Sequence, residues 1–357
     1  MKKMKKLLAM SLVLTMGLQL AACGGSKEEP KEEVKSEGTQ EAAAPAGETY
    51  ELRFAHIFPG NGNEQKWFDY AKEEIEKQSE GHVIINIYPD GTLGSESELT
   101  PQVLAGTLDM SFSGPSVWGD AINLPELGWS EMPYLVTNYD DMNKLGMALP
   151  ELTNQQLETA GMDLYCLGAM SQGLRCVMNT KKEITSLADM SGMKCRVPES
   201  AMYVNTVESF GASATVMSSS ELYSALQQGV VEAYENDPAT AVARNLHEVL
   251  KYYSTTNHIA SLNLLLVNKS NLEELPEEYR NIVKDVFADA CAQQLEDRVI
   301  ENNKLIDTMA ESGMVVTDLT DEQRQEFVDS VKPMKEEYIA ENGLEDIMAQ
   351  LEEILAQ

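Results

Sequence analysis

S-Q-G-L-R-C-V-M-N at residues 171–179 and G-M-K-C-R-V-P at residues 192–198 are two short segments in which apolar residues alternate with others. This period of two predicts two β-strands that each bury one face in a core, with Arg175 and Arg196 on the opposite face. Pro198 ends the second strand because it has no N–H to donate to a sheet. Arg196 therefore lies near a strand end, where α/β sheets commonly place ligand sites, and the two arginines are candidates for gripping a buried anion.

A third segment, E-L-Y-S-A-L-Q-Q-G-V-V-E-A-Y-E-N-D-P at residues 221–238, predicts a helix followed by a strand. Leucine and tyrosine side chains recur along one helical face before Gly229, which is a typical helix stop. Residues 230–234 then have the character of a strand, and this strand delivers Glu235 and Asn236 to its end. Polar side chains are therefore expected at that strand end.

Together the three segments resemble one family, the extracytoplasmic solute-binding proteins of tripartite ATP-independent periplasmic (TRAP) transporters, of the dicarboxylate-binding (DctP) type. The family's run is approximately G-x-K-x-R-V-P, then E-x-Y-x-A-L-Q-x-G-V-V-D-G-Q-E-N-P, then K-Y-x-x-x-T-x-H. This chain matches the run at residues 192–198, 221–236 and 251–258. The resemblance extends from residue 52 to about residue 323, and the ordered series of matches makes it more specific than any single motif.

Two departures from the family's run affect one wall of the expected pocket. Ala233 and Tyr234 stand where the family usually has Gly-Gln, and Asp237 is inserted before Pro238. The shape of that wall does not follow from the resemblance.

The resemblance implies a two-lobed α/β fold of the type II periplasmic-binding-protein-like class, with a hinge and a long helix that bridges both domains. Domain I is expected at residues 49–172 plus 262–300, and domain II with the C-terminal helices at residues 173–261 plus 301–357. The residues themselves predict the long helix, because residues 277–312 form the longest segment of helical periodicity. At 1.5 Å per residue this helix is roughly 50 Å long, which is more than one lobe needs.

Alternating strands and helices are also predicted near the start of the globular region. Strand–helix alternation of this kind favours a mainly parallel sheet covered by helices. Beyond Pro333 we expect two short acidic helices. The predicted strands cover residues 51–57, 83–88 and 108–113, and the predicted helices between them cover residues 64–78 and 97–107.

The beginning of the chain indicates export. A lysine-rich start precedes an apolar run at residues 7–20 that is too short to span a membrane. The sequence L-A-A-C-G at residues 20–24 resembles the lipobox of bacterial lipoproteins, in which the cysteine is lipidated; an ordinary signal peptide with an incidental cysteine is the alternative. We therefore expect a lipoprotein signal peptide at residues 1–22, and a lipidated Cys23 with a disordered acidic tether at residues 23–48. The protein would then be extracytoplasmic and anchored to the cell membrane.

Composition excludes some functions. The chain of 357 residues has a formal net charge of −31, whereas a nucleic-acid-binding protein needs a basic face. The cysteines other than Cys23 lack the spacing of a metal site, so neither a metal nor another cofactor is expected. Cys176 and Cys195 could form a disulfide, but free buried thiols are the favoured interpretation.

Three residues are candidates for holding a ligand carboxylate. The resemblance implies that Arg196 makes the main salt bridge and that Arg175 is the family's second arginine. A guanidinium suits this role because its planar donor fork matches both carboxylate oxygens. Asn236 could donate its amide N–H to the same carboxylate. The alternatives are arginines paired structurally with protein carboxylates, and an asparagine that bonds its own backbone at a strand end.

Other candidate ligand residues have weaker support. Glu96 lies in a loop, T-L-G-S-E-S, that resembles one contacting polar parts of ligands in the family; a solvated acid at a helix start is the alternative. His258 matches a family position, but a lone histidine beside a strand is more often a structural group. Four further side chains are candidates to line the cleft, although aromatic residues are more often core residues: His56, Phe58, Trp118 and Tyr234.

The sequence contains no nucleophile elbow, H-E-x-x-H or P-loop motif, so we do not expect an enzyme. The expected function is capture of an organic acid and its delivery to TRAP membrane permease subunits by a monomeric protein. Glu96, Asn61, Asn63 and Tyr234 favour a hydroxylated ligand, such as a uronate or an aldonate. Two alternatives stay open: a C4-dicarboxylate as the ligand of the same class of transporter, and a tethered ligand sensor lipoprotein.

Overall fold

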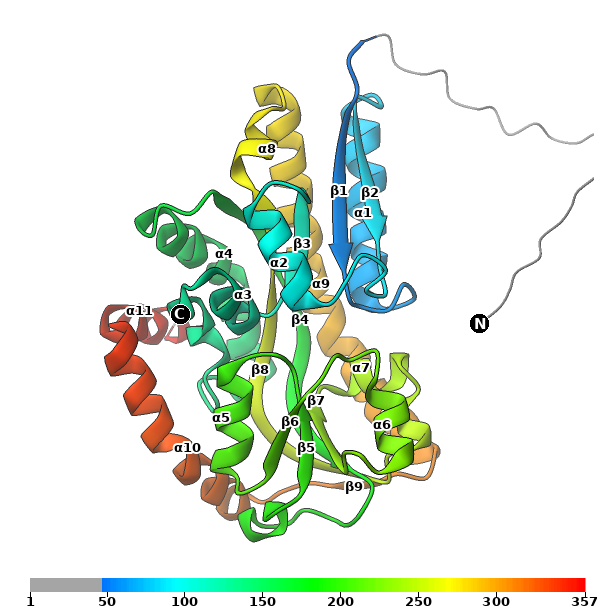
Figure 1. Cartoon of the computed structure of the whole chain (residues 1–357), viewed down its shortest axis with the longest axis vertical. Helices are drawn as coiled ribbons and strands as arrows, with labels where there is room; N and C mark the ends of the chain where they lie inside the picture. Colours follow the sequence, from blue (N-terminus) through cyan, green and yellow to red (C-terminus); the bar gives the residue numbers. More distant parts are fainter. Residues whose placement is uncertain (1–46, 357) are drawn as a thin grey trace, which may run out of the picture. The chain divides into compact units, whose positions relative to one another are not determined.

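Two long antiparallel strands, β4 (Leu164–Asn179) and β8 (Tyr252–Asn268), run through the middle of the fold and belong to both lobes (Figure 1). The computed structural model describes residues 47–356. The predicted signal peptide, Cys23 and nearly all of the predicted tether lie outside the described residues. Almost every residue of both strands is buried, so neither strand has the solvent face that a period of two implies.

One sheet extends outward from these two strands, in the order β2-β1-β3-β8-β4-β7-β5-β6, with β9 also paired to β8. The pairs β1–β2, β1–β3, β5–β6, β5–β7 and β8–β9 are parallel, whereas β3–β8, β4–β8 and β4–β7 are antiparallel. The expectation of a mainly parallel sheet thus holds within each lobe and is wrong at the centre. The shorter strands are β1 (Tyr50–His56), β2 (Val83–Tyr88), β3 (Met110–Ser113), β5 (Lys194–Val197), β6 (Ser213–Val216), β7 (Ala233–Asn236) and β9 (Val315–Thr317).

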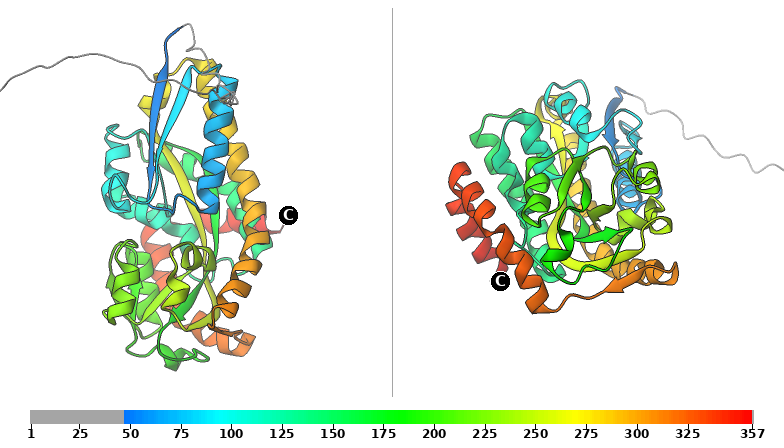
Figure 2. Two further views of the ribbon diagram at one scale, coloured as in Figure 1. Left: turned by 90° about the vertical axis from the view of Figure 1, so that its right-hand side faces the viewer. Right: turned by 60° about the horizontal axis from the view of Figure 1, so that its bottom comes forward.

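The helices divide between the two lobes in the same way as the strands (Figures 1 and 2). Those with β1, β2 and β3 are α1 (Asn63–Gln78), α2 (Glu96–Leu104), α3 (Pro115–Ile122), the 3₁₀ helix η1 (Pro125–Glu131), α4 (Tyr139–Thr159) and α8 (Lys269–Glu273). Those with β5, β6 and β7 are η2 (Leu187–Met190), α5 (Ala201–Ser209), α6 (Leu222–Gln228), α7 (Pro238–Ala243) and η3 (Leu246–Glu248).

Each lobe has its own apolar core. In the first lobe, Phe54, Phe68 and Phe287 pack in edge-to-face contacts and are fully buried. In the second lobe, Phe210 and Phe327 do the same. Separate cores of this kind allow two lobes to move as bodies about the strands that join them.

The joining strands change their register where the chain passes between the lobes. A β-bulge lies between Ser171 and Gly173 of β4, and Gly173 faces Ser261 of β8. These positions coincide with the boundaries expected from the sequence, after residues 172 and 261. The division into domains at these boundaries stays a prediction.

The long helix α9 (Glu277–Glu311) has 35 residues and confirms the predicted bridging element. It packs against α1 of the first lobe, against β4, and against α7 of the second lobe (Figure 2). Among residues 47–356, no helix combines the length and the apolar character that a membrane span requires.

The expectation of two short helices beyond Pro333 is wrong. One helix, α10 (Asp321–Asn342), passes through Pro333, and α11 (Glu345–Leu355) follows it. Thr320 and Gln323 form a capping box that fixes the start of α10, and Phe327 and Val331 bury its inner face. This packing outweighs the one backbone hydrogen bond that a proline removes.

A substitution at Gly173 tests how tightly the bulge is packed. Gly173 has a φ of 117°, and a Cβ added there would overlap the side-chain amide of Asn302. Gly173→Ala should lower the free energy of unfolding by about 3 kcal/mol, measured by chemical denaturation. Gly161→Ala is the matched control: its φ of 65° is also positive, but a Cβ there meets nothing within 4 Å. The control should lose only about 1 kcal/mol, and equal losses would show that the bulge is not crowded.

Candidate functional site

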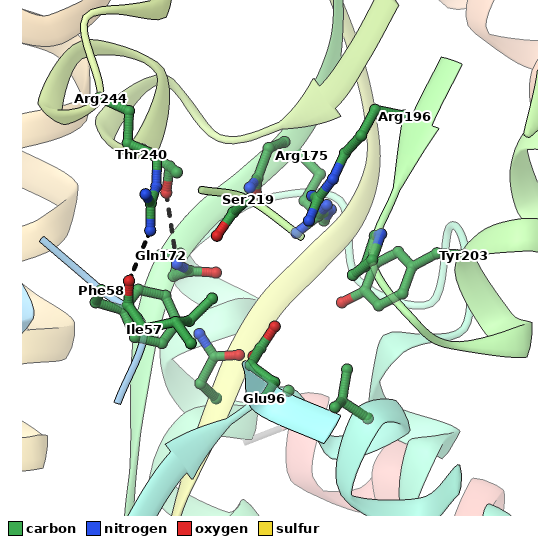
Figure 3. A pocket seen from close by; sticks show the side chains of 15 residues that line it. Ile57, Phe58, Glu96, Gln172, Arg175, Arg196, Tyr203, Ser219, Thr240 and Arg244 are labelled. Atoms are coloured by element: carbon green, nitrogen blue, oxygen red, sulfur yellow. Dashed lines mark hydrogen bonds between the residues drawn. The ribbon is translucent and has the colours of Figure 1, made fainter. Parts of the chain in front are cut away.

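A cavity lies between the two lobes, and about 460 Å³ of space there, including space open to solvent, is not occupied by atoms (Figure 3). Five of the eight ligand residues predicted from the sequence line it. Two come from the first lobe, and three come from the central and second-lobe strands. These five residues are Phe58, Glu96, Arg175, Arg196 and Asn236.

Arg196 is a buried cation with no ion-pair partner in the described part of the chain. It lies on β5 and is 4% exposed, and its Nε donates to the Met217 carbonyl at 2.9 Å. Loss of solvation lowers the pKa of Arg196, although Tyr234 and Glu235 nearby oppose that effect. A buried guanidinium that lacks a carboxylate is costly, and a bound anion would remove the cost.

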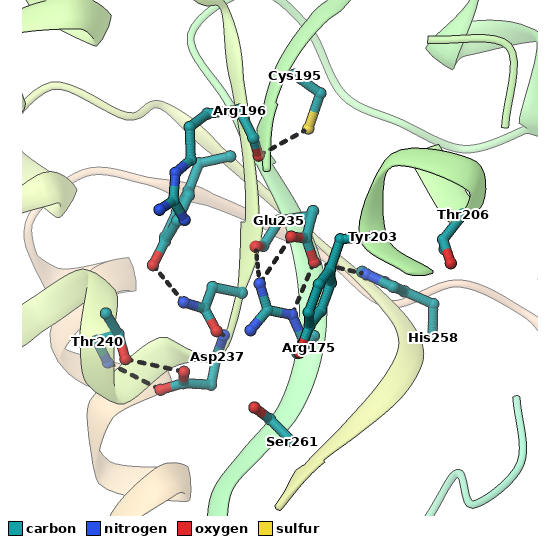
Figure 4. A network of polar contacts seen from close by, with 12 residues as sticks. Arg175, Cys195, Arg196, Tyr203, Thr206, Glu235, Asp237, Thr240, His258 and Ser261 are labelled. Carbon is teal, nitrogen blue, oxygen red and sulfur yellow. Dashed lines mark hydrogen bonds and ion pairs between the residues drawn. The ribbon is translucent and has the colours of Figure 1, made fainter. Parts of the chain in front are cut away.

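Arg175, by contrast, is already paired within the protein (Figure 4). Its Nε and Nη2 donate to the two carboxylate oxygens of Glu235 at 2.8 and 2.7 Å, and Nη2 also donates to the Glu235 carbonyl. Burial alone would lower the pKa of Arg175, but Glu235 outweighs it and raises that pKa. The structural pairing given as the alternative is therefore present. A ligand contact through Nη1, which bonds to none of the described residues, stays a prediction.

His258 completes this buried network on the far side of Glu235. Its Nε2 lies 3.1 Å from Glu235 Oε2, and its Nδ1 lies 2.9 Å from Thr256 Oγ1. Burial lowers the pKa of His258, so the neutral form that donates from Nε2 fits the geometry. Burial would raise the pKa of Glu235, but Arg175 and His258 hold it down at about 2. His258 is thus a structural group.

Asn236 is held at the cavity wall by two of the three residues that depart from the family's run. Its Nδ2 donates to Tyr234 Oη at 2.5 Å, and its Oδ1 accepts the Asp237 amide at 3.0 Å. Asp237 in turn caps α7 by accepting the Thr240 amide at 2.8 Å. Glu235 and Asn236 lie within β7 and not beyond its end, because the strand runs through residue 236.

Glu96 begins α2 and points into the cavity, so it is not the solvated helix-start acid that was the alternative (Figure 3). It accepts a hydrogen bond from Ser113 Oγ at 2.7 Å. Burial raises the pKa of Glu96, while Ser113 and then Arg196 oppose that rise. The first lobe therefore places an acceptor across the cavity from the arginines of the second lobe.

Three predicted residues do not line the cavity. His56 packs among Phe54, Phe58 and Phe68, with its Nε2 3.0 Å from Gln65 Oε1. The residue type alone could not distinguish a cleft residue from a core residue. Trp118 and Tyr234 are also fully buried: Trp118 donates to the Leu264 carbonyl, and Tyr234 supports Asn236 from beneath.

Several lining residues were missed because no local pattern marks them. Arg244 ends α7, lines the cavity, and donates from Nη2 to the Ile57 carbonyl at 2.6 Å. Tyr203 on α5 lies flat against Arg175, with the guanidinium carbon 4.5 Å from its ring centre, and donates to Glu131 of the first lobe. Other polar residues missed are Gln172, Ser219, Thr240 and Asn263.

The cysteines and the described acidic side chains offer no metal centre. Cys166, Cys176, Cys195 and Cys291 are free and buried, which confirms free thiols over a Cys176–Cys195 disulfide. In residues 47–356, no three histidine, cysteine, aspartate or glutamate side chains are grouped to hold a metal ion.

A two-lobed α/β fold with an arginine-lined cavity between its lobes defines a solute-binding protein. Residues 54–342 match the model of the DctP family, bacterial extracellular solute-binding protein family 7, and the chain belongs to this family. The long bridging helix and the two-lobed fold follow the family's expectation.

Named relatives and a solved structure agree with that assignment. The chain is 27% identical over 258 residues to the 2,3-diketo-L-gulonate-binding periplasmic protein of Escherichia coli, covering 72% of this chain and 77% of the relative. It is 25% identical over 300 residues to the C4-dicarboxylate-binding periplasmic protein of Rhodobacter capsulatus, covering 84% and 89%. A TRAP solute-binding protein of Citrobacter koseri, solved with bound D-glucuronate, has the same fold with a TM-score of 0.78. That structure is 24% identical and covers 85% of this chain and 99% of its own.

The buried His56 predicts a loss of stability in acid. Burial lowers the pKa of His56 from 6.5 to about 4, so its contribution is complete above pH 6.5 and is lost as the pH falls from 6.5 to about 4. At about 1.4 kcal/mol per pKa unit, the loss is about 3 kcal/mol. Denaturation curves at pH 7 and pH 4 should show a smaller pH effect in His56→Gln than in the wild type. His82→Gln, at a less buried histidine, should behave as the wild type does; the same result for His56→Gln would contradict the argument.

Proposed function

We propose that this solute-binding protein captures a sugar acid that carries one carboxylate and several hydroxyl groups. The observation that carries the proposal is Arg196, a buried guanidinium with no carboxylate partner on a cavity wall. In the proposed complex the ligand carboxylate pairs with Arg196 and receives further hydrogen bonds from Asn236 and from Arg175 Nη1. Each hydrogen bond to a charged group contributes about 1.5 to 3 kcal/mol.

The rest of the cavity suits hydroxyl groups better than a second carboxylate. Glu96 is an acceptor for hydroxyl hydrogens, and its negative charge disfavours a second anion beside it. Gln172, Ser219 and Asn263 supply neutral donors and acceptors on the same lining. The solved relative with bound D-glucuronate and the E. coli relative named for 2,3-diketo-L-gulonate support a sugar acid for this chain, whereas the R. capsulatus relative supports the C4-dicarboxylate alternative.

The proposed mechanism is capture and not turnover. The lobes close about β4 and β8 around the ligand, and the closed form docks on membrane permease subunits that carry out the transport. We further propose that the mature protein is a monomer outside the cytoplasm, held at the membrane by lipids on Cys23. The acidic segment after Cys23 would give the binding lobes reach above the membrane surface.

Replacing Arg196 tests the proposed carboxylate site. Arg196→Ala should weaken binding of the tightest sugar acid by about 2 to 5 kcal/mol, or roughly 30-fold to several thousand-fold, because the carboxylate would be left buried and unpaired. Isothermal titration calorimetry measures this against a panel of uronates, aldonates and C4-dicarboxylates.

Lys194→Ala is the control for this variant. It removes an exposed cation two residues earlier on β5 and should change the affinity less than twofold. A loss below threefold in a folded Arg196→Ala protein would remove Arg196 from the ligand site. A panel in which C4-dicarboxylates bind most tightly would replace the sugar acid with that alternative.

Lipid attachment is tested in the bacterium that makes the protein. Growth with a labelled fatty acid should label the wild-type protein, and Cys23→Ser should abolish the label because the thiol that receives the lipid is gone. Cys166→Ser, at a buried thiol, should stay labelled. A wild-type protein that is processed and released without label would instead show an ordinary signal peptide.

A further inference from the structure

Arg244 is a second cation on the cavity wall, and it links the lobes. It follows α7 in the second lobe, and its Nη2 donates at 2.6 Å to the Ile57 carbonyl just after β1 of the first lobe. The residue lines the cavity and also a second hollow, beside Ser95 and Ser218. Arg244 therefore lies where the cavity and both lobes meet.

The guanidinium of Arg244 has unused donors. Its Nε is buried and has no hydrogen-bond partner, and its Nη1 bonds to no other described residue. No carboxylate within residues 47–356 forms a salt bridge with it. A buried N–H of a cation without an acceptor is costly, so this group requires oxygen atoms that the described protein does not supply.

The position of Arg244 separates it from the proposed carboxylate site. In Figure 3, Arg244 and Arg196 lie on opposite sides of the cavity, with Gln172 and Ser219 between them. A carboxylate bound at Arg196 therefore leaves the remote end of the ligand facing Arg244.

The balance of charges among the residues that line the cavity favours hydroxyl groups, and not a second carboxylate, at the end of the ligand near Arg244. Arg175 is neutralised by Glu235, so Arg196 and Arg244 face Glu96 as the remaining charges of the lining. A ligand with one carboxylate balances these charges. A ligand with two carboxylates would leave an excess negative charge beside the buried side chains of the lining, which is unfavourable.

We propose that Arg244 is the residue that selects ligand length: it donates from Nε and Nη1 to hydroxyl oxygens at the end of the sugar acid remote from the carboxylate. The same guanidinium holds the Ile57 carbonyl, so oxygen atoms at this end also favour closure of the first lobe onto the second. This inference rests on the proposed function, because it assumes that the carboxylate lies at Arg196.

The test is a thermodynamic cycle that combines one substitution in the protein with the removal of one hydroxyl group from the ligand. The parent ligand is D-gluconate or D-glucuronate, whichever binds the wild-type protein more tightly. Its partner lacks the hydroxyl group farthest from the carboxylate: 6-deoxy-D-gluconate, or 2-deoxy-D-glucuronate in its pyranose form. The wild type should bind the deoxy partner roughly 10- to 100-fold more weakly than the parent, as expected for one hydrogen bond from a charged donor.

Arg244→Ala should bind parent and deoxy ligand with nearly equal affinity, because the donor for that hydroxyl is gone. Arg244→Lys keeps a cation at this position and should recover part of the preference for the parent; this variant also covers the case in which alanine disturbs the fold. Arg196→Ala should weaken both ligands and keep their ratio. Thermal unfolding of each variant shows that the comparison is made on folded protein.

The outcomes separate the two proposals. If the wild type binds no uronate or aldonate of the panel, the proposed function fails, and this inference fails with it. If the wild type binds the parent tightly but Arg244→Ala keeps the full preference over the deoxy partner, the proposed function stands and the role of Arg244 is wrong. An equal loss for both ligands in Arg244→Ala would make Arg244 a contact between the lobes that does not sense ligand length.

Discussion

The buried ion pair between Arg175 and Glu235 is the interaction on which the site depends. It joins β4 to β7 inside the protein, where an unpaired charge of either kind would cost several kcal/mol. His258 donates a further hydrogen bond to the Glu235 carboxylate, and the Glu235 carbonyl accepts another from Arg175; these extra bonds help to make a buried pair tolerable. Because Glu235 neutralises Arg175, Arg196 is the cation on that wall that has no carboxylate partner among the described residues.

The same pair connects the ligand wall to the contact between the lobes. Tyr203 stacks on the Arg175 guanidinium, and its hydroxyl donates a hydrogen bond to Glu131 of the first lobe. The Tyr203 side chain therefore supports the ligand wall and also connects the two lobes. Burial raises the pKa of Glu131, while its bonds to Ser116 and Tyr203 oppose that rise. These hydrogen bonds offset the cost of burying the acid, and they do so without using the donors of Arg196.

The sequence predicted those features whose signal is local or periodic. Arg196 and Asn236 were found because they lie in short strands inside a specific run of residues, and α9 was found because helical periodicity persists over its length. The partner of Arg175 could not be found, since the pairing of β4 with β7 brings together residues 60 positions apart. His56 and Trp118 were misplaced because an aromatic residue has the same local signal in a core and in a cleft. Arg244 had no signal, because a single arginine after a six-residue helix belongs to no pattern.

A formal net charge of −31 opposes the approach of an anion to the protein surface, and burial of the site resolves this conflict. Exposed carboxylates are screened over about 8 Å at physiological ionic strength, so most of the acidic surface has little influence inside the cavity. In the proposed complex Arg196 and Arg244 act on the ligand at hydrogen-bonding distance, where each interaction is far stronger than at the surface. The surface charge opposes binding of nucleic acid, whereas the charges of the site act at short range on the proposed ligand. Glu96 adds the remaining constraint on that ligand: one protein carboxylate beside two arginines without a carboxylate partner in the described part of the chain leaves room for one ligand carboxylate and favours hydroxyl groups for the rest.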